Sequence, residues 1–203
     1  MKLAVTIPQT DASRTITFTA TIKVDDKHID STVTKTATVD AKKAEITILQ
    51  TIQFGTNYNS QKVGSYTATW SVTCDNNTWN VANFNNNNNG WNYIKCGNKT
   101  SASKATLSTA SAISGQVTSI VVTIDAITTS KVNAIYLEVA NDADFNNIME
   151  TVNVTAAKGD LTFAISNNAQ AQNLYYRITF DCAKGTSNGL VQVSKIVVNG
   201  YAA

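Results

Sequence analysis

The sequence predicts an all-β fold, an antiparallel β-sandwich, on three observations. Thr, Val and Ile, which favour pleated strands, are abundant along the whole chain. Apolar and polar residues alternate over many short runs, as expected of strands with one buried face. Gly, Asn, Asp and Ser stand between these runs, where turns are needed. No segment has helical periodicity, and a short turn near residues 142–149 stays open.

Residues 1–45 are predicted to be a partial immunoglobulin-like β segment. Its apolar residues alternate with Thr, and residues 25–28 (DDKH) form a turn-like break. A complete immunoglobulin-like sandwich needs about seven strands and about 100 residues, and this segment has only about half that length. We therefore expect a truncated sandwich or an arm of strands, followed by a linker at residues 40–43. The expected strands are 3–7, 15–24 and 29–39.

Residues 46–203 are predicted to be a jelly-roll β-sandwich. After an opening strand at 44–53, about nine more strands are expected, with turns every 8–12 residues, as in sandwiches and jelly rolls. These strands are 65–72, 79–84, 105–108, 119–127, 134–139, 151–155, 160–165, 174–181 and 189–198. Trp70 and Trp79 fall in alternating strands, so we expect both in the core.

Composition excludes several classes of protein. Hydrophobic residues make up 43% of the chain and charged residues 15%, which indicates a folded protein. The net charge of +2 is small and the basic residues are scattered, so no nucleic-acid partner is expected. No apolar run approaches the roughly 20 residues of a membrane span, and the N-terminal run stops at Ile7, short of a signal sequence. We therefore expect either a fragment of a longer protein or export without a signal.

The three cysteines, Cys74, Cys96 and Cys182, form an odd set with no paired spacing. We expect them to be small buried hydrophobic residues, as in a protein folded in a reducing cytoplasm.

The asparagine-rich segment 83–92 is the main candidate for a binding loop. Amide groups can pair with sugar hydroxyls, and aromatic side chains give a large contact area at low entropic cost. The alternative is that the amides satisfy their own turns, with Trp91 and Phe84 in the core. The candidate ligand-binding residues are Asn85, Asn86, Asn87, Asn88, Asn89, Trp91 and Tyr93.

Catalytic and metal-binding signals are weak. His28 is the only histidine, and it lies far in sequence from every Cys. Four acids could supply a glycosidase pair, but nothing singles out two of them: Asp125, Glu138, Asp160 and Asp181. The D-x-D-x-N spacing from Asp142 lacks the Gly and Glu of a calcium loop. We expect no enzyme and no cofactor, while a structural calcium site built from backbone carbonyls stays open.

The second domain resembles a known type of module. The run WNVANFNNNNNGWNYIKCGNKTSAS from Trp79, the segments ATLSTASAIS and SIVVTIDAI, and the ending YYRITFDCAKGTSNGLVQVSKIVVNGY carry this resemblance. They are similar to a module that recurs in surface and virion proteins of gut Bacteroidetes and their phages. The ending also looks like the last strands of galactose-binding-like jelly rolls. The resemblance implies a jelly roll without catalytic residues, and the N-terminal part resembles bacterial immunoglobulin-like surface repeats.

The leading functional hypothesis is a non-catalytic virion surface protein of a bacteriophage, such as a head or tail fibre or a decoration protein. Its loops would contact host-surface glycans, and its N-terminal strands would contact other virion proteins or further copies of the chain. One alternative is a carbohydrate-binding module of a secreted or cell-surface bacterial protein, which would be extracellular. The other is a purely structural spacer.

Overall fold

The computed structural model describes residues 14–24, 27–39, 45–55, 58, 61–87 and 90–203, with side chains in the first two strands only at 15–19 and 34–38. The chain divides into two compact units, Met1–Glu45 and Ile46–Ala203. The strand expected at 3–7 and the linker expected at 40–43 lie outside the described residues.

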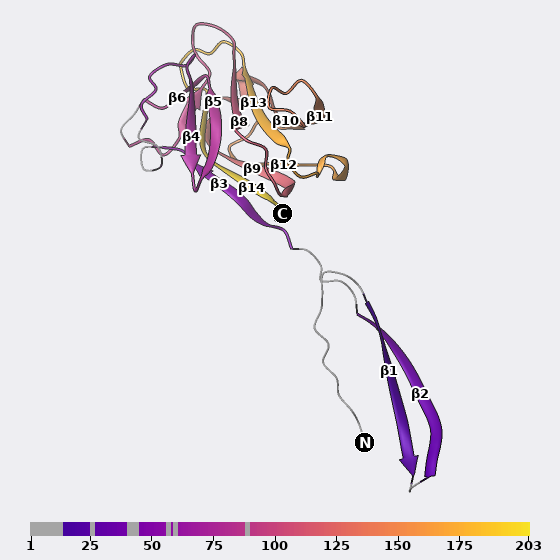
Figure 1. Ribbon diagram of the computed structural model, residues 1–203. Helices are drawn as coiled ribbons and strands as arrows, with labels where there is room; N and C mark the ends of the chain where they lie inside the picture. The colour runs from indigo at the N-terminus through magenta and orange to yellow at the C-terminus, as the bar shows by residue number, and fades with distance from the viewer. Residues whose placement is uncertain (1–13, 25–26, 40–44, 56–57, 59–60, 88–89) are drawn as a thin grey trace. The chain divides into compact units, whose positions relative to one another are not determined.

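The first unit contains a two-stranded antiparallel sheet of β1 (Arg14–Val24) and β2 (Lys27–Val39), drawn in indigo in Figure 1. Thr residues lie opposite one another along it, as at Thr17 and Thr36, and both are exposed. The expected turn at 25–28 was too long, because residues 27 and 28 already pair within β2. Two strands do not distinguish an immunoglobulin-like segment from any other hairpin, so that assignment stays a prediction.

The second unit is an antiparallel β-sandwich, which confirms the predicted fold class (Figure 1). One sheet, called here the β13 sheet, has the strand order β11-β10-β13-β8-β5-β4. Its strands, in chain order, are β4 (Thr69–Cys74), β5 (Asn77–Ala82), β8 (Ser103–Thr109), β10 (Val132–Ala140), β11 (Ile148–Val154) and β13 (Tyr175–Cys182).

The other sheet, called here the β14 sheet, has the order β12-β9-β14-β7-β6, with β3 also paired to β14. Its strands are β3 (Thr47–Gln53), β6 (Phe84–Asn85), β7 (Ile94–Cys96), β9 (Gln116–Ile127), β12 (Gly159–Ala164) and β14 (Val191–Tyr201). The chain passes repeatedly from one sheet to the other, for example from β8 to β9, from β9 to β10 and from β13 to β14. Such crossings are typical of jelly rolls.

The core lies between the two sheets and follows from the alternation of each strand. In β14, Val191, Val193, Ile196 and Val198 are fully buried, while the residues between them are half-buried. Period-two alternation places one set of side chains on the inner face of each sheet. Trp70 and Trp79 are buried, as expected from the sequence.

Strand boundaries differ from expectation around the asparagine-rich segment. Residues 65–68 precede β4 and form a turn, in which the Thr67 amide donates to Ser65 Oγ at 3.1 Å. The strand expected at 79–84 ends at Ala82 in the structure, and Phe84 and Asn85 form a separate strand, β6, which pairs with β7. Such short strands carry too few residues for an alternation to be visible in the sequence. Two 3-10 turns, Thr129–Lys131 and Asn167–Ala169, are the helical elements of the described residues.

Candidate functional site

The candidate site is a cluster of aromatic side chains and one lysine where the asparagine-rich segment enters β7. We call Tyr66, Trp91, Tyr93 and Lys95 the aromatic cluster. Lys95 lies in β7 between Ile94 and Cys96, which are both fully buried, whereas Trp91 and Tyr93 precede the strand. Because successive side chains of a strand point to opposite faces, Lys95 lies on the outer face of β7. Trp91, Tyr93 and Lys95 are each half-buried.

The members of the cluster hold one another in place. The rings of Trp91 and Tyr93 lie 5.4 Å apart between centroids, tilted by 30°. Lys95 Nζ lies 4.0 Å from the centroid of the Trp91 ring and 5.3 Å from that of Tyr93. A cation over an aromatic face is attracted by the ring quadrupole, with about 0.5–1 kcal/mol at exposed sites. The parts of these side chains that face solvent therefore form a preorganised surface.

Tyr66 and Gly189, which lies in the loop before β14, are neighbours of the Lys95 side chain. A Cβ on Gly189 would lie 2.8 Å from Lys95 Cδ and 3.3 Å from Tyr66 Oη. Gly189 also has a φ of +79°, which L side chains rarely adopt. Burial raises the pKa of Tyr66 above its ordinary value of 10.0, and the nearby Cys96 adds to the rise. The phenol therefore stays neutral at physiological pH and can both donate and accept a hydrogen bond.

A second loop packs on the backbone of Trp91. A Cβ on Gly55 would lie 2.4 Å from the Trp91 carbonyl oxygen, and the φ of Gly55 is +111°. The close approach therefore requires a glycine. Tyr58, whose amide donates to the Gly55 carbonyl at 3.1 Å, is 52% exposed. Its loop thus adds an exposed aromatic residue to the surroundings of the aromatic cluster.

The asparagines of the segment divide into supporting and exposed residues. Asn86 is 2% exposed, and its Nδ2 donates to the Gln61 carbonyl at 2.7 Å. Asn85 is 6% exposed, and its Oδ1 accepts the Asn87 amide at 2.8 Å. These two side chains organise the turn, as the structural alternative for this segment expected. Asn87 is exposed, and the positions 88 and 89 lie outside the described residues.

The predicted site residues are thus brought together only in part. The rings of Trp91 and Tyr93 lie together, the Asn87 side chain lies beside Gly64, and a binding role stays a prediction for all three residues. Lys95 was missed, although it stands only two residues after Tyr93 in the sequence. Tyr66 was missed because no local pattern shows that its loop meets β7.

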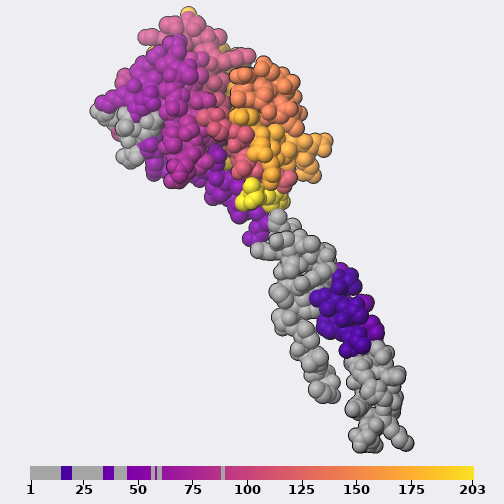
Figure 2. Space-filling model, in the orientation of Figure 1, coloured from indigo at the N-terminus to yellow at the C-terminus, as the bar shows by residue number. Residues whose placement is uncertain are grey.

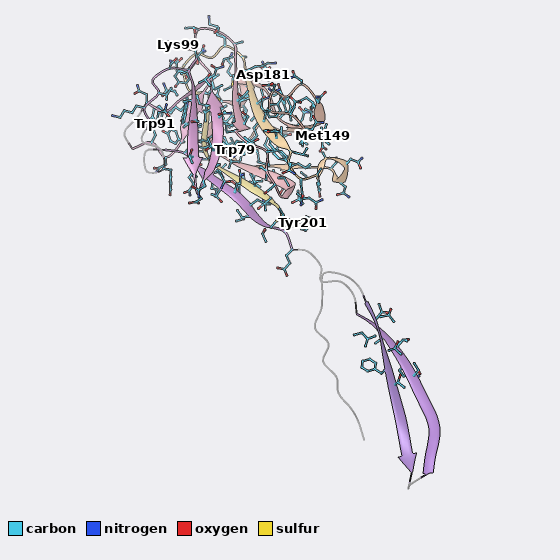
Figure 3. All side chains as sticks on the ribbon, in the orientation of Figure 1. Trp79, Trp91, Lys99, Met149, Asp181 and Tyr201 are labelled. Atoms are coloured by element: carbon cyan, nitrogen blue, oxygen red, sulfur yellow. The ribbon has the colours of Figure 1, made fainter. Side chains whose placement is uncertain are left out.

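Figure 3 shows Trp91 at one flank of the second unit, Met149 at the opposite flank and Trp79 between them. In the space-filling view of Figure 2, purple segments around the candidate site form one flank of this unit, and orange segments form the other. The aromatic cluster thus lies on the side away from β11 and β12.

The D-x-D-x-N segment is a self-capped turn. The Asp142 carboxylate accepts the amides of Asp144, Asn146 and Asn147 at 2.8–3.1 Å. These backbone hydrogen bonds lower the pKa of Asp142 below its ordinary value of 3.8. Within the part of the chain that the structure describes, no group of three or more His, Cys, Asp or Glu side chains could hold a metal ion.

The four acids considered as a glycosidase pair are each engaged by a different partner. Arg177 Nε donates to Glu138 Oε2 at 2.7 Å, and Lys104 pairs with Asp181 at 3.4 Å. On the other sheet, Ser194 Oγ donates to Asp125 and Thr123 Oγ1 donates to Asp160, at 3.0 and 2.6 Å. The structure shows no arrangement that pairs two of these carboxylates.

Comparisons with known proteins show likeness at the level of the fold. No family model and no curated protein sequence matches the chain. One solved structure is a carbohydrate-binding module, TmCBM27, described for its specific mannan recognition. It has a TM-score of 0.36 and 9% identity, covering 77% of this chain and 99% of that one. A second solved structure comes from work on the promiscuous specificity of carbohydrate-binding modules of the β-sandwich superfamily. It has a TM-score of 0.37 and 10% identity, and the match covers 94% of this chain and 73% of that one.

Because both TM-scores are below 0.5, these similarities carry no argument about function, which is argued below from the residues of this chain. Among the described residues, no helix is long and apolar enough to cross a membrane.

Proposed function

We propose that the second unit is a non-catalytic carbohydrate-binding module, acting outside the cell or at its surface. The observation that carries the proposal is the stacked arrangement of Trp91, Tyr93 and Lys95 on the outer face of a rigid β-sandwich. Loops and edges held by such a scaffold commonly carry binding function.

The chemistry of the aromatic cluster suits a sugar. Indole and phenol rings offer apolar surface to the C–H groups of a pyranose, and their ordering costs little entropy. The Lys95 ammonium, the Tyr66 hydroxyl and the exposed Asn87 amide offer donors and acceptors for hydroxyl groups. Because Lys95 lies over the Trp91 ring, the sugar would meet the solvent-facing parts of the two rings together with the ammonium group.

The site favours this function over the bacteriophage virion hypothesis. The virion hypothesis depends on the resemblance of the sequence to phage modules, and none of the contacts described above is specific to a virion. A surface built for glycan contact is common to both hypotheses. The binding-module hypothesis accounts for the aromatic cluster without assuming a virion partner.

The test is a glycan array followed by titration calorimetry on the best hit, using the full chain. Trp91→Ala and Tyr93→Ala should each weaken binding about tenfold or more, since each would remove a central aromatic contact. The matched control is Tyr136→Ala. Tyr136 is a half-buried tyrosine on the outer face of the β13 sheet, between the buried Ile135 and Leu137.

Two outcomes would overturn the proposal. Loss of binding in Tyr136→Ala with full binding in Trp91→Ala would move the site to the outer face of the β13 sheet. An array with no hit for the folded wild-type chain would favour the structural spacer.

A further inference from the structure

We propose that the aromatic cluster takes acidic glycans, whose sugar rings carry a carboxylate or a sulfate group, in preference to neutral glycans. This inference rests on the proposed function and names the class of sugar that the same site accepts. It depends on how the second unit distributes its charges around Trp91 and Tyr93.

The Lys95 ammonium is the charged group of the cluster. Its Nζ lies 4.0 Å from the centroid of the Trp91 ring and 5.3 Å from that of Tyr93, and its side chain is half-buried. Among the described residues, no carboxylate forms an ion pair with Lys95. Because a partly buried charge is screened less than a fully solvated one, this ammonium can attract the acid group of a sugar that stacks on the two rings.

Tyr66 supplies a second hydrogen-bond donor beside this ammonium. A Cβ on Gly189 would lie 2.8 Å from Lys95 Cδ and 3.3 Å from Tyr66 Oη, so both side chains border the same point. Burial raises the pKa of Tyr66, and the phenol therefore keeps its proton. An ammonium and a phenol next to each other can both donate to the oxygens of one carboxylate or sulfate group.

The segments that contain the cluster and its neighbouring loops carry lysine and no acidic residue. Residues 54–66, 76–124 and 183–203 contain neither Asp nor Glu. Their basic residues are Lys62, Lys95, Lys99, Lys104, Lys184 and Lys195.

Two of these lysines lie on loops that are joined next to the cluster. The loop after β7 meets the loop before β14, where the Gly189 amide donates to the Gly97 carbonyl at 2.8 Å and the Lys99 amide donates to Asn188 Oδ1 at 2.9 Å. Lys99 and Lys184 are exposed on these loops, and Figure 3 shows Lys99 and Trp91 on the same flank of the second unit. A polymer with repeated negative charges would therefore meet further ammonium groups beyond Lys95.

Several carboxylates lie at the opposite end of the β13 sheet. Strands β4 and β10 run in one direction and β13 runs in the other. Asp75 follows β4, and Asp142 and Asp144 follow β10, whereas the loop 183–190 beside the cluster follows β13. This uneven distribution makes the potential more positive at the end where the cluster lies, which favours the approach of an anionic chain.

Two carboxylates nearer the cluster are held by other partners. Asp181 pairs with Lys104 at 3.4 Å, and Asp125 accepts a hydrogen bond from Ser194 Oγ at 3.0 Å. Asp125 lies in β9, and β14 stands between β9 and β7, so two strand spacings of about 4.8 Å each separate it from the strand of Lys95. Neither carboxylate therefore neutralises the Lys95 ammonium.

The test is titration calorimetry of the full chain with two matched pairs of oligosaccharides. One pair is oligogalacturonate and its carboxyl-reduced form, and the other is a sulfated galactan oligosaccharide and its desulfated form. Within each pair the ratio of the two Kd values reports the acid group alone. The wild-type chain should bind the acidic member of at least one pair about tenfold or more tightly, as a charge-assisted hydrogen bond would give. The pair that shows this ratio distinguishes carboxylate from sulfate, and about 0.5 M NaCl should reduce the ratio.

Three variants assign the preference to the cluster. Lys95→Gln should bring the ratio close to one, whereas Lys95→Arg keeps the positive charge and should retain the preference. Lys158→Gln is the matched control, because it removes an exposed lysine from the loop between β11 and β12, on the side away from the cluster. It should leave the ratio unchanged. Circular dichroism checks that each variant is folded.

The possible failures of this inference and of the proposed function are distinguishable. Equal affinity for acidic and neutral members, with binding lost in Trp91→Ala, would overturn the acidic preference and leave the binding module intact. Array hits restricted to neutral glycans would do the same. A ratio that falls equally in Lys95→Gln and Lys158→Gln would show a general effect of charge and would overturn the role of the cluster. An array with no hit would overturn both the preference and the proposed function.

Discussion

The three tryptophans show how differently one residue type is used in this chain. Trp79 is fully buried, and its Nε1 donates to Gln50 Oε1 at 3.0 Å. Trp70 is 7% exposed and donates to the Phe84 carbonyl at 3.0 Å. Trp91 is half-buried and lies beneath the Lys95 ammonium. Two of the three therefore serve the core, and the third belongs to the surface.

This contrast predicts different costs of truncation. Trp79→Ala should lower the free energy of unfolding by about 3–5 kcal/mol, because it leaves a large cavity between the sheets. Trp91→Ala is the matched control and should cost clearly less, since part of its ring already faces solvent. Urea unfolding followed by far-UV circular dichroism measures both. Equal losses would show that Trp91 is part of the core.

The hydrogen bonds in the Asp142 turn predict that the Asp142 carboxyl group titrates at a lower pH in the folded chain than in the unfolded chain. Backbone hydrogen bonds from Asn146 and Asn147 hold the pKa of Asp142 below 3.8 in the folded chain. The contribution of this turn to stability is therefore fully present above the unfolded-state pKa, and it is lost as pH falls through the lower folded-state pKa.

NMR titration of the Asp142 carboxyl carbon, with the urea-unfolded chain as the reference, should show this difference. The amides of Asn146 and Asn147 should shift with the same midpoint. A folded-state pKa at or above that of the unfolded chain would contradict the assignment. Asp142→Asn should abolish the coupled shifts of the two amides.

At the scale of elements, β14 organises its sheet because it pairs on both sides. It lies against β9 along most of its length and against β7 and β3 on its other edge. Gly200 sits near its end, where a Cβ would lie 2.1 Å from the Gln116 carbonyl oxygen. The strand thus approaches the backbone of β9 more closely than any side chain allows.

This close approach predicts that Gly200→Ala destabilises the second unit by about 1–3 kcal/mol through overpacking. The obstacle is backbone and cannot rotate away. In Gly64→Ala, the control, a Cβ would meet the Asn87 amide nitrogen at 3.0 Å, and this flexible side chain can move. Differential scanning calorimetry of both variants measures the difference. A Gly200→Ala chain as stable as the control would contradict the close packing of β14 on β9.

At the scale of the whole molecule, the hydrophobic core formed by the described residues lies in the second unit. Every residue of the buried cluster lies between Ile52 and Val198, within the unit Ile46–Ala203. A two-stranded sheet such as β1–β2 is only marginally stable by itself. The second unit therefore has what it needs to fold alone.

We expect residues 46–203, expressed alone, to unfold cooperatively with a Tm within about 3 °C of the corresponding transition of the full chain. Its ¹H–¹⁵N NMR spectrum should overlay the signals of the same residues in the full chain. A broad transition, or shifted signals throughout the core, would show that residues 1–45 contribute to the fold. The same two samples, compared by light scattering, test the expected self-association through the N-terminal strands.

The alternation of apolar and polar residues in this chain is enough to predict an all-β sandwich. It also predicts the positions of its longer strands and the burial of Trp70 and Trp79. These properties depend on residues near one another in sequence, because the side-chain period of a strand is local.

The tertiary structure alone decided which distant segments meet. It paired the short strands β6 and β7, placed Tyr66 beside Lys95, and put Cys96 and Cys182, which come from opposite sheets, into one buried core. It also showed that Asn85 and Asn86 support the turn from within. These contacts depend on how the two sheets stack and on how the loops close over them, and no local period in the sequence encodes either.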